Sequence, residues 1–416
     1  MEWYDFFLYA TASALVFNKI FFAADDPAVG TLLSLGTFGV GFLARPIGAV
    51  LFGSLGDRLG RKPSLVATLI LMGVATTGIG LVPDYHTIGV WAPVLLVILR
   101  LLQGLGAGAE HAGATVFAAE YASPRRRGLF GAIPGSGLYV GVLLSSGIFG
   151  LFASMPDEAF LAWGWRIPFL ISVALVAVGL FIRLRLDETP EFKEAEEHHE
   201  IVGSPLLTTF RSQWRSVLIV IGVVAGPFTA TYAYQTYSLS YLTQQLGGSG
   251  STGTLALTIA SVVAIVAVPL AGGLSDRIGR RPVIIGGSVF SAAFAFPFFW
   301  LLHSGPVGVI LAMVGGVGIG VPLMLGAQGA LLAELFNARN RFTGFSVSRE
   351  LGSVLFAGMT PLVAAALVVA AGGASWPVSS YVVGACLLTL VVGIAIRETR
   401  PTDTAPTPPR STSVVP

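Results

Sequence analysis

The feature that most constrains this chain is a series of apolar runs, each long enough to cross a lipid bilayer. A helix needs about 20 mostly apolar residues to span the hydrocarbon core. Twelve such runs can be read along the 416 residues, at 3–22, 29–55, 64–83, 93–119, 129–152, 165–186, 214–240, 253–274, 282–303, 306–335, 343–370 and 377–397. The runs are continuous and do not alternate, which argues against a membrane β-barrel. The sequence therefore predicts an all-α membrane protein with twelve transmembrane helices.

The composition agrees with a chain surrounded by lipid. Charged residues make up only 11% of the chain, less than half of the roughly 25% that is typical of soluble domains, while 54% are hydrophobic. This composition excludes a soluble enzyme, a disordered regulator and a nucleic-acid-binding protein, and it makes membrane lipids the expected surroundings. The single cysteine, Cys386, allows neither an intrachain disulfide nor a cysteine-based metal site.

Basic residues are concentrated in every second connection between the runs. The connections after runs two, four, six, eight and ten, together with the C-terminal tail, hold 19 of the 24 Lys and Arg residues. By the positive-inside rule, these connections and both termini are expected to face the cytoplasm.

The longest hydrophilic segment divides the runs into two sets of six. It contains His198 and His199, but no third ligand has a spacing suited to zinc, so no metal site is expected. We expect an N-terminal six-helix half, a cytoplasmic linker, a C-terminal six-helix half and a disordered cytoplasmic tail, at 1–186, 187–213, 214–400 and 401–416.

A motif after the second run of each half is repeated with a shift of 219 residues. The first copy contains Gly53, Asp57, Arg58, Gly60, Arg61 and Lys62, and the second contains Gly272, Asp276, Arg277, Gly279, Arg280 and Arg281. A weaker repeat relates Glu120 and Arg127 to Glu334 and Arg341. Two similar six-helix halves are one way in which transporters build a site that opens to either side.

The repeat resembles the signature of the major facilitator superfamily, and Arg100-Leu-Leu-Gln103-Gly104 resembles its second signature. Four further segments look like the metabolite:proton symporter family, namely Glu2-Trp-Tyr-Asp5-Phe-Phe-Leu-Tyr9, Ala44-Arg45-Pro46-Ile-Gly48, Gly108-Ala-Glu110-His-Ala-Gly113-Ala and Trp163-Gly-Trp165-Arg166-Ile-Pro168-Phe. The resemblance extends through Arg400 and implies a monomeric transporter of the bacterial cytoplasmic membrane. Members of this family carry shikimate, 2-oxoglutarate, citrate, proline and betaine.

The chain differs from this family in three places. Relatives usually have a leader and more apolar residues before Glu2, so the first span is expected to begin upstream of the given Met1. They tend to have an aromatic residue in place of His111, and they usually lack the Arg349-Glu350 pair.

Charged side chains inside the apolar runs are functional candidates because a bilayer makes them expensive to bury. Asp5, Glu2 and Glu110 are the predicted proton-coupling residues, with static ion pairs as the alternative. Asp5 lies fourteen residues before Lys19, or ~21 Å along a helix, which places it well inside the membrane.

Arg45 and Arg100 are the predicted charge partners of these acids or anchors for a carboxylate substrate. Arg100 and Glu110 lie ~15 Å apart on one helix and cannot pair with each other. The natural partners are therefore Asp5 or Glu2 for one of them and Arg45 for the other. His111 could join a proton relay or form a helix-packing hydrogen bond.

The family resemblance implies that spans one, four, seven and ten line a central cavity. Polar residues of these spans are candidate substrate contacts: Tyr9, Gln103, Tyr234, Gln235, Tyr237 and Gln328. In the seventh run, Tyr234, Tyr237 and Tyr241 share one helix face, whereas Tyr232 and Gln235 lie on another. Helix packing and anchoring at the membrane interface are the alternative roles.

The repeated loops are predicted to form a cytoplasmic gate, with a plain topology signal as the alternative. Glycine permits a tight turn, and an aspartate can interact with the positive N-terminus of a neighbouring helix. We expect Asp57 to contact the start of the eleventh span and Asp276 the start of the fifth, which would hold the cytoplasmic side closed.

The sequence therefore predicts a secondary transporter that is not an enzyme and uses the proton as coupling ion, with no other cofactor. The favoured activity is import of a small organic acid or zwitterion. A proton-driven exporter of amphipathic compounds is the first alternative. A non-transporting sensor is the second, although the chain contains no segment long enough for a signalling domain. An ATP-driven pump is disfavoured because the chain has no Gly-x-x-x-x-Gly-Lys-Ser/Thr element.

Overall fold

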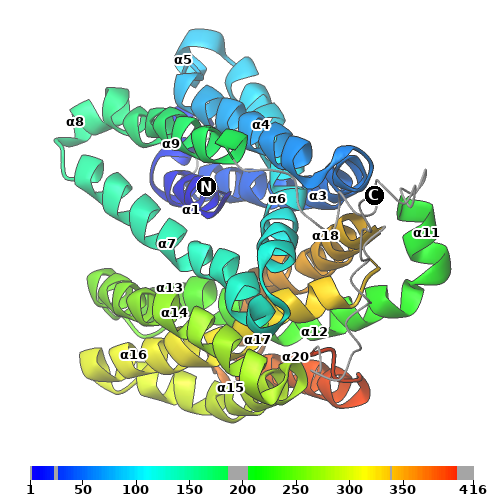
Figure 1. Ribbon diagram of the computed structural model, residues 1–416. Helices are drawn as coiled ribbons and strands as arrows, with labels where there is room; N and C mark the ends of the chain where they lie inside the picture. The colour runs from blue at the N-terminus through cyan, green and yellow to red at the C-terminus, as the bar shows by residue number, and fades with distance from the viewer. Residues whose placement is uncertain (1, 23–26, 186–204, 338–339, 401–416) are drawn as a thin grey trace, which may run out of the picture.

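The computed structural model describes residues 2–22, 27–185, 205–337 and 340–400, and helices dominate these ranges (Figure 1). Eleven helical segments in this part of the chain are long and apolar enough to cross a membrane. The remaining predicted span corresponds to Glu2–Ile20, where two helices flank a π-helical turn without a break. Its lower hydropathy follows from the charges at Glu2, Asp5 and Lys19. The predicted all-α membrane fold is confirmed.

Most helix ends lie close to the predicted ones. The helices of the N-terminal half are α1 (Glu2–Ala12), α2 (Asn18–Ile20), α3 (Pro27–Leu59), α4 (Arg61–Leu81), α5 (Tyr85–Ile88), α6 (Trp91–Tyr121), α7 (Arg127–Ala153), α8 (Asp157–Ala159) and α9 (Arg166–Arg185). Of the predicted linker at 187–213, the structure describes the part that contains α11 (Pro205–Ser212). The predicted tail at 401–416 and the His198–His199 pair lie outside the described residues.

The C-terminal half repeats the arrangement. Its helices are α12 (Trp214–Tyr232), α13 (Ser238–Gln244), α14 (Gly250–Ile278), α15 (Arg280–Leu302), α16 (Gly305–Met313), α17 (Val321–Glu334), α18 (Arg341–Gly352), α19 (Thr360–Ala370) and α20 (Trp376–Ala395). Several spans are continued through π-helical turns, at Ser13–Phe17, Ala233–Tyr237, Val314–Gly320 and Ser353–Gly358. Such turns widen a helix locally and are frequent at functional sites.

The two halves meet along two pairs of helices. In Figure 1 the helices of the N-terminal half, coloured from blue through cyan to the green of α9, lie above most helices of the C-terminal half, coloured from green through yellow to red. The most extensive contacts between the halves join α3 to α18 and α7 to α14. A site between the halves is therefore bordered by helices from both.

Glycines allow the closest helix contacts, both within a half and between the halves. A Cβ atom added at Gly108 of α6 would lie 2.1 Å from the carbonyl oxygen of Arg45 on α3. At Gly53 it would lie 2.9 Å from Cα of Thr343, and at Gly272 it would lie 2.5 Å from the carbonyl oxygen of Gly128. Gly53 and Gly272 are equivalent positions of the repeat, so each inter-half contact depends on a residue without a side chain.

Replacing Gly108 by Ala is expected to lower the melting temperature of the purified protein in detergent, because the methyl group would displace α3. Overpacking of this kind costs about 1–3 kcal/mol. Gly147→Ala in α7 is the matched control, since a Cβ atom there would meet no atom within 4 Å. Equal melting temperatures for the two variants would contradict this account of the α3–α6 contact.

Candidate functional site

A cluster of buried charges lies where α1 and α3 of the first half meet α18 of the second. The Arg45 guanidinium lies 3.3 Å from Glu2 Oε1 through Nη2 and 3.7 Å from Glu350 Oε2 through Nη1. Glu350 also pairs with its neighbour Arg349. All four side chains are buried. Two guanidiniums and two carboxylates thus form a cluster in which the charges balance.

Aromatic rings surround the two guanidiniums. The centre of the Arg45 guanidinium lies 5.9 Å from the Trp3 ring, 4.9 Å from Phe6 and 5.0 Å from Phe42. That of Arg349 lies 5.2 Å from the Phe228 ring. Cation–π attraction within about 6 Å helps to compensate a cation for its lost hydration.

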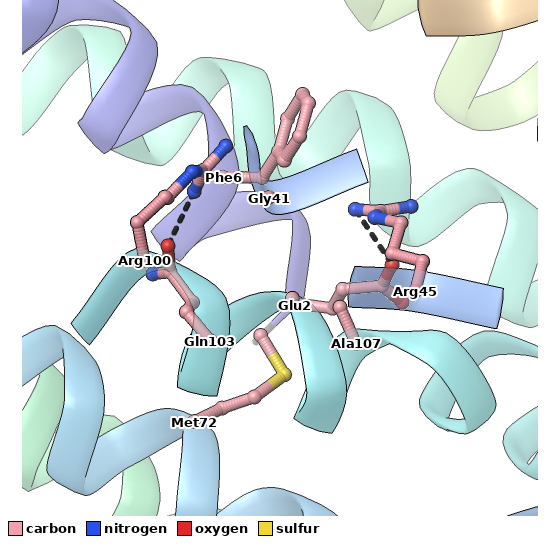
Figure 2. Close-up of a pocket in the computed structure, with 9 residues that line it drawn as sticks. Glu2, Phe6, Gly41, Arg45, Met72, Arg100, Gln103 and Ala107 are labelled. Carbon is pink, nitrogen blue, oxygen red and sulfur yellow. Dashed lines mark hydrogen bonds and ion pairs between the residues drawn. The ribbon is translucent and has the colours of Figure 1, made fainter. Parts of the chain in front are cut away.

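Beside this cluster lies a pocket within the N-terminal half (Figure 2). It is a cavity of about 10 Å³ lined by Glu2, Phe6, Gly41, Arg45, Met72, Arg100, Gln103, Gly104 and Ala107. Ligand pockets usually measure about 300–1,000 Å³. This conformation is therefore closed around the pocket, and a metabolite could enter only after the surrounding helices move.

Arg100 forms the second cationic centre of the pocket. It donates a hydrogen bond to Gln103, which donates to Thr76 at 2.8 Å (Figure 2). Its guanidinium lies 4.1 Å from the centre of the Tyr9 ring, and the Tyr9 hydroxyl donates to Thr37 at 2.6 Å. The structure thus brings together Arg100, Tyr9 and Gln103, three residues singled out from the sequence.

Asp5 lies inside the N-terminal half. Its Oδ1 accepts a hydrogen bond of 2.8 Å from Ser172 of α9, and the side chain is fully buried. Tyr9 follows one turn later on the same helix, so Asp5 lies on the side of α1 that leads towards Arg100.

The predicted pairing of Arg45 with Glu110 is wrong. Glu110 pairs with Arg183 of α9 at 3.1 Å, and Arg183 also donates to the carbonyl of Leu65. Arg45 instead contacts Glu2 and Glu350. Helical spacing along one chain does not reveal which neighbour a long guanidinium reaches, which is why the sequence did not distinguish these partners.

The tyrosines of the seventh span point in different directions. The Tyr234 ring stacks on Phe298, with ring centres 4.0 Å apart, inside an apolar cluster built mostly from the C-terminal half, and the Tyr237 ring lies 6.3 Å from that of Tyr241. Tyr232 instead reaches the first half, where its ring lies 6.0 Å from that of Phe42. The face that carries Tyr232, and not the one that carries Tyr234, is therefore directed at the charge cluster.

Two predicted glutamine contacts remain available to a ligand. Gln235 and Gln328 are buried, and within the described residues neither the amide of Gln235 nor Oε1 of Gln328 has a hydrogen-bond partner. A buried amide group without a partner is costly.

The two repeated aspartates each contact the opposite half. They lie at the end of the bundle where α3 meets α4 and α14 meets α15, here called the basic end. Asp57 accepts hydrogen bonds from the backbone N–H groups of Phe342 and Thr343, at 3.2 and 2.8 Å. Asp276 accepts from those of Gly128 and Leu129, at 2.8 and 2.9 Å. Both contacts expected from the sequence are present.

Further pairs of the repeat support these aspartates. Arg61 lies 2.9 Å from Asp57 and 3.5 Å from Glu120, which also pairs with Arg341 at 3.1 Å. In the second half, Arg280 lies 2.7 Å from Asp276 and 3.1 Å from Glu334. Gly60 and Gly279 have φ angles of 109° and 106°, a region that favours glycine. A pocket between the halves is lined by Glu120, Arg127, Ala333, Glu334 and Arg341, among others.

The other basic residues of the motif lie at the surface of this end. Arg58 and Arg277 are exposed. Lys62 donates to the carbonyl of Leu184 at 3.0 Å, and Arg281 donates to those of Gly393 and Ile394. These residues hold the turn of each half against the last span of the same half.

Glu398 is a participant that the sequence did not reveal. Its carboxylate accepts hydrogen bonds from the backbone N–H groups of Arg280 and Arg281, at 2.8 and 3.1 Å, and so caps the start of α15. Thr399 donates to Glu334 at 2.5 Å. An acid directly after an apolar run is a possible helix cap, but the sequence does not indicate which helix it reaches.

Replacing Asp57 or Asp276 by Asn is expected to loosen the basic end, since a charge-assisted hydrogen bond contributes about 1.5–3 kcal/mol. Opening would be followed by the labelling rate of a cysteine introduced at Ala333, using a hydrophilic maleimide; native Cys386 is buried. We expect the rate to rise about tenfold, the factor that corresponds to 1.4 kcal/mol.

The matched control for that experiment is Asp84→Asn. Asp84 also caps a helix, accepting from Thr87 at 2.8 Å, but it precedes α5, away from the basic end. Labelling of the Asp57 and Asp276 variants at the rate of the control would show that these contacts do not hold the halves together.

Comparisons with known proteins agree with this fold. A family model described as "Sugar (and other) transporter" matches residues 1–202, and one described as "Major Facilitator Superfamily" matches residues 228–416. Over 407 residues the chain is 39% identical to the inner membrane metabolite transport protein YhjE of Escherichia coli K12, covering 96% of this chain and 92% of that protein.

Two further relatives have named substrates. The chain is 36% identical to the shikimate transporter of Escherichia coli K12, covering 96% of this chain and 92% of that protein. It is also 36% identical to the proline/betaine transporter of Salmonella typhimurium LT2, covering 96% and 81%. The proton:xylose symporter XylE superposes with a TM-score of 0.77 over 96% of this chain and 95% of that one, at 18% identity, a likeness that shows the fold.

Proposed function

The chain belongs to the major facilitator superfamily of membrane transporters, and from that premise we propose that it is a proton-coupled symporter. It would import a small organic acid or zwitterion across the bacterial cytoplasmic membrane. The substrates named for the relatives, shikimate and proline or betaine, are small and each carry a carboxylate, which supports this class.

The observation that carries the proposal is the buried cluster of Arg45, Glu2 and Glu350 between the halves. Arg45 and Arg349 can bind a carboxylate through two N–H groups each. The neighbouring rings of Trp3, Phe6 and Phe42 would cover the apolar part of a small solute. Because one chain contributes both sides of the site, a monomer would suffice.

Alternating access would follow from the contacts at the basic end. With the basic loops in the cytoplasm, as the positive-inside rule requires, the structure is closed towards the cytoplasm. Opening inward would separate α3 from α18 and α7 from α14, and so break the hydrogen bonds of Asp57 and Asp276. The two halves would then rock around the central cluster.

Buried acids of the N-terminal half would carry the proton. Asp5, Glu2 and Glu110 are the proposed groups. Arg100 packs on Tyr9, which lies one turn after Asp5 on α1, and would set the electrostatic potential around Asp5. Gln235 and Gln328 would orient the substrate, and Tyr9 and Gln103 would do so through Arg100. The placement of Tyr232 makes it a better candidate contact than Tyr234 or Tyr237.

Export of amphipathic compounds is the alternative, and it requires a larger and more apolar cavity. The pocket lined by Glu2, Arg45 and Arg100 is small and charged, which disfavours it. The direction of flux in vesicles of known orientation would decide between import and export.

The experiment that tests the proposed function is uptake by proteoliposomes that contain the full chain. Radiolabelled shikimate, 2-oxoglutarate, proline and betaine would be offered with an imposed pH gradient, alkaline inside. We expect one of them to accumulate. Asp5→Asn is expected to abolish accumulation while leaving substrate exchange, because its buried carboxylate could no longer take up a proton.

Asp157→Asn, at the exposed start of α8, is the control for loss of an acid. Glu110→Gln is expected to behave like Asp5→Asn. Full accumulation by both amide variants would remove Asp5 and Glu110 from the proton pathway. Absence of uptake for every compound would count against the substrate class.

A further inference from the structure

The carboxylate of Glu350 bridges two guanidiniums that belong to different halves. One oxygen pairs with Arg349 on the same helix, and the other lies 3.7 Å from Arg45 Nη1 on α3. Glu350, Arg349 and Arg45 are 1%, 3% and 2% exposed, respectively. A single anionic group therefore links the halves within the membrane, about 10 Å along α18 from the contact of Asp57 with Thr343.

This link is incompletely satisfied. A separation of 3.7 Å exceeds a normal hydrogen bond, and within the described residues neither Glu350 Oε2 nor Arg45 Nη2 has a hydrogen-bond partner. Buried charged groups normally have their hydrogen-bonding capacity filled. The two guanidiniums thus form a site for a carboxylate, and the Glu350 carboxylate that lies in it does not complete its hydrogen bonds.

Each half contributes one guanidinium and one carboxylate to the cluster, so the halves can separate without leaving an unpaired charge. Arg45 keeps Glu2 within the first half, at 3.3 Å, and Arg349 keeps Glu350 within the second. Each half therefore retains a neutral ion pair when the Arg45–Glu350 contact breaks. Removing one partner of a buried ion pair is strongly destabilising because it leaves an uncompensated charge, and this arrangement avoids that penalty.

We propose that Glu350 stands in for the carboxylate of the substrate, so that the site takes one monocarboxylate together with one proton. This inference rests on the proposed symport. When Glu350 binds a proton, it no longer neutralises Arg349 and Arg45. The substrate carboxylate then occupies the same position and bridges the two halves in its place.

Coupling follows from the charge of the buried cluster. With Glu350 ionised and no substrate, or with Glu350 protonated and one monocarboxylate bound, the cluster is neutral. If Glu350 is protonated and no substrate is bound, the cluster carries one excess positive charge. If a substrate is bound and Glu350 is ionised, the cluster carries one excess negative charge. Burying an uncompensated charge is costly, so only the two neutral forms change conformation readily. Transport is then electroneutral, with one proton for each substrate.

Other charged groups near Glu350 do not replace it in this role. Glu2 pairs with Arg45 inside one half, so its pairing does not cross the interface. Tyr232 on α12 and Glu110 and His111 on α6 lie close enough to interact electrostatically with the cluster, and Glu110 is held by Arg183. The other acids on helices packed against α18, Asp57, Glu120 and Glu334, lie at the basic end in ion pairs of their own. Glu350 is the acid whose carboxylate pairs with the guanidiniums of both Arg45 and Arg349.

The net charge of the cluster also distinguishes between substrate classes. A dicarboxylate would bring two negative charges for one proton, and a zwitterion would bring none, so either would leave the cluster charged. Shikimate, succinate and betaine are therefore suitable probes of one monocarboxylate, one dicarboxylate and one zwitterion.

The test uses proteoliposomes of the full chain, with the pH gradient and the membrane potential imposed separately. We expect the ratio of internal to external shikimate to rise about tenfold per unit of pH difference, the value for one proton per substrate. We expect the membrane potential to leave this ratio unchanged. In Glu350→Gln we expect accumulation above the external concentration to be lost, while exchange of internal for external shikimate remains detectable. Glu158→Gln, an exposed acid, is the control.

Uptake driven by the membrane potential, or full accumulation by Glu350→Gln, would overturn the proposal. Uptake of betaine or succinate in preference to shikimate would also contradict it while leaving the proposed symport intact. If no probe enters, the proposed function fails, and a measurement without substrate still decides the role of Glu350.

That measurement is the distance between spin labels at Tyr121 and Asn337, exposed positions at the basic end of the two halves. In wild type we expect acidification to slow the interconversion of closed and open conformations, each of which has its own distance between the labels, because protonated Glu350 leaves the cluster charged. Glu350→Gln should show the reduced exchange at every pH. A distance distribution in this variant that changes with pH as in wild type would overturn the proposal.

Discussion

The structure depends on carboxylates of one half that bind the first backbone amides of a helix in the other. A helix start has unpaired N–H groups and a partial positive charge, so an aspartate satisfies it without a long side chain. Asp57 does this for α18 and Asp276 for α7. The close approach of the helices depends on Gly53 and Gly272, which leave room for the opposing backbone.

Much of this fold could be predicted from the sequence because it follows from strong local signals. The length and continuity of the apolar runs determine the helices, and lipid leaves few other ways to satisfy the backbone. The two contacts of Asp57 and Asp276 were also predictable, because the repeated motif places each acid at a helix end and the family resemblance indicates the partner helix.

The pairing inside the bundle was less predictable, because it depends on the rotation of each helix and on long side chains. Glu110 binds Arg183 and not Arg45, and Tyr234 packs on Phe298 while Tyr232 faces the interface. Glu398 caps α15 from a distant part of the chain. In each case the residue type was informative, and its partner became evident only from the three-dimensional arrangement.

The two aspartate contacts lie on different helix pairs, α3 with α18 and α7 with α14. In the proposed transport cycle, inward opening separates both helix pairs. If only one contact broke, the halves would pivot about the other, and the passage would stay partly obstructed. We therefore expect both contacts to break together, so that the transition between closed and open forms is close to all-or-none.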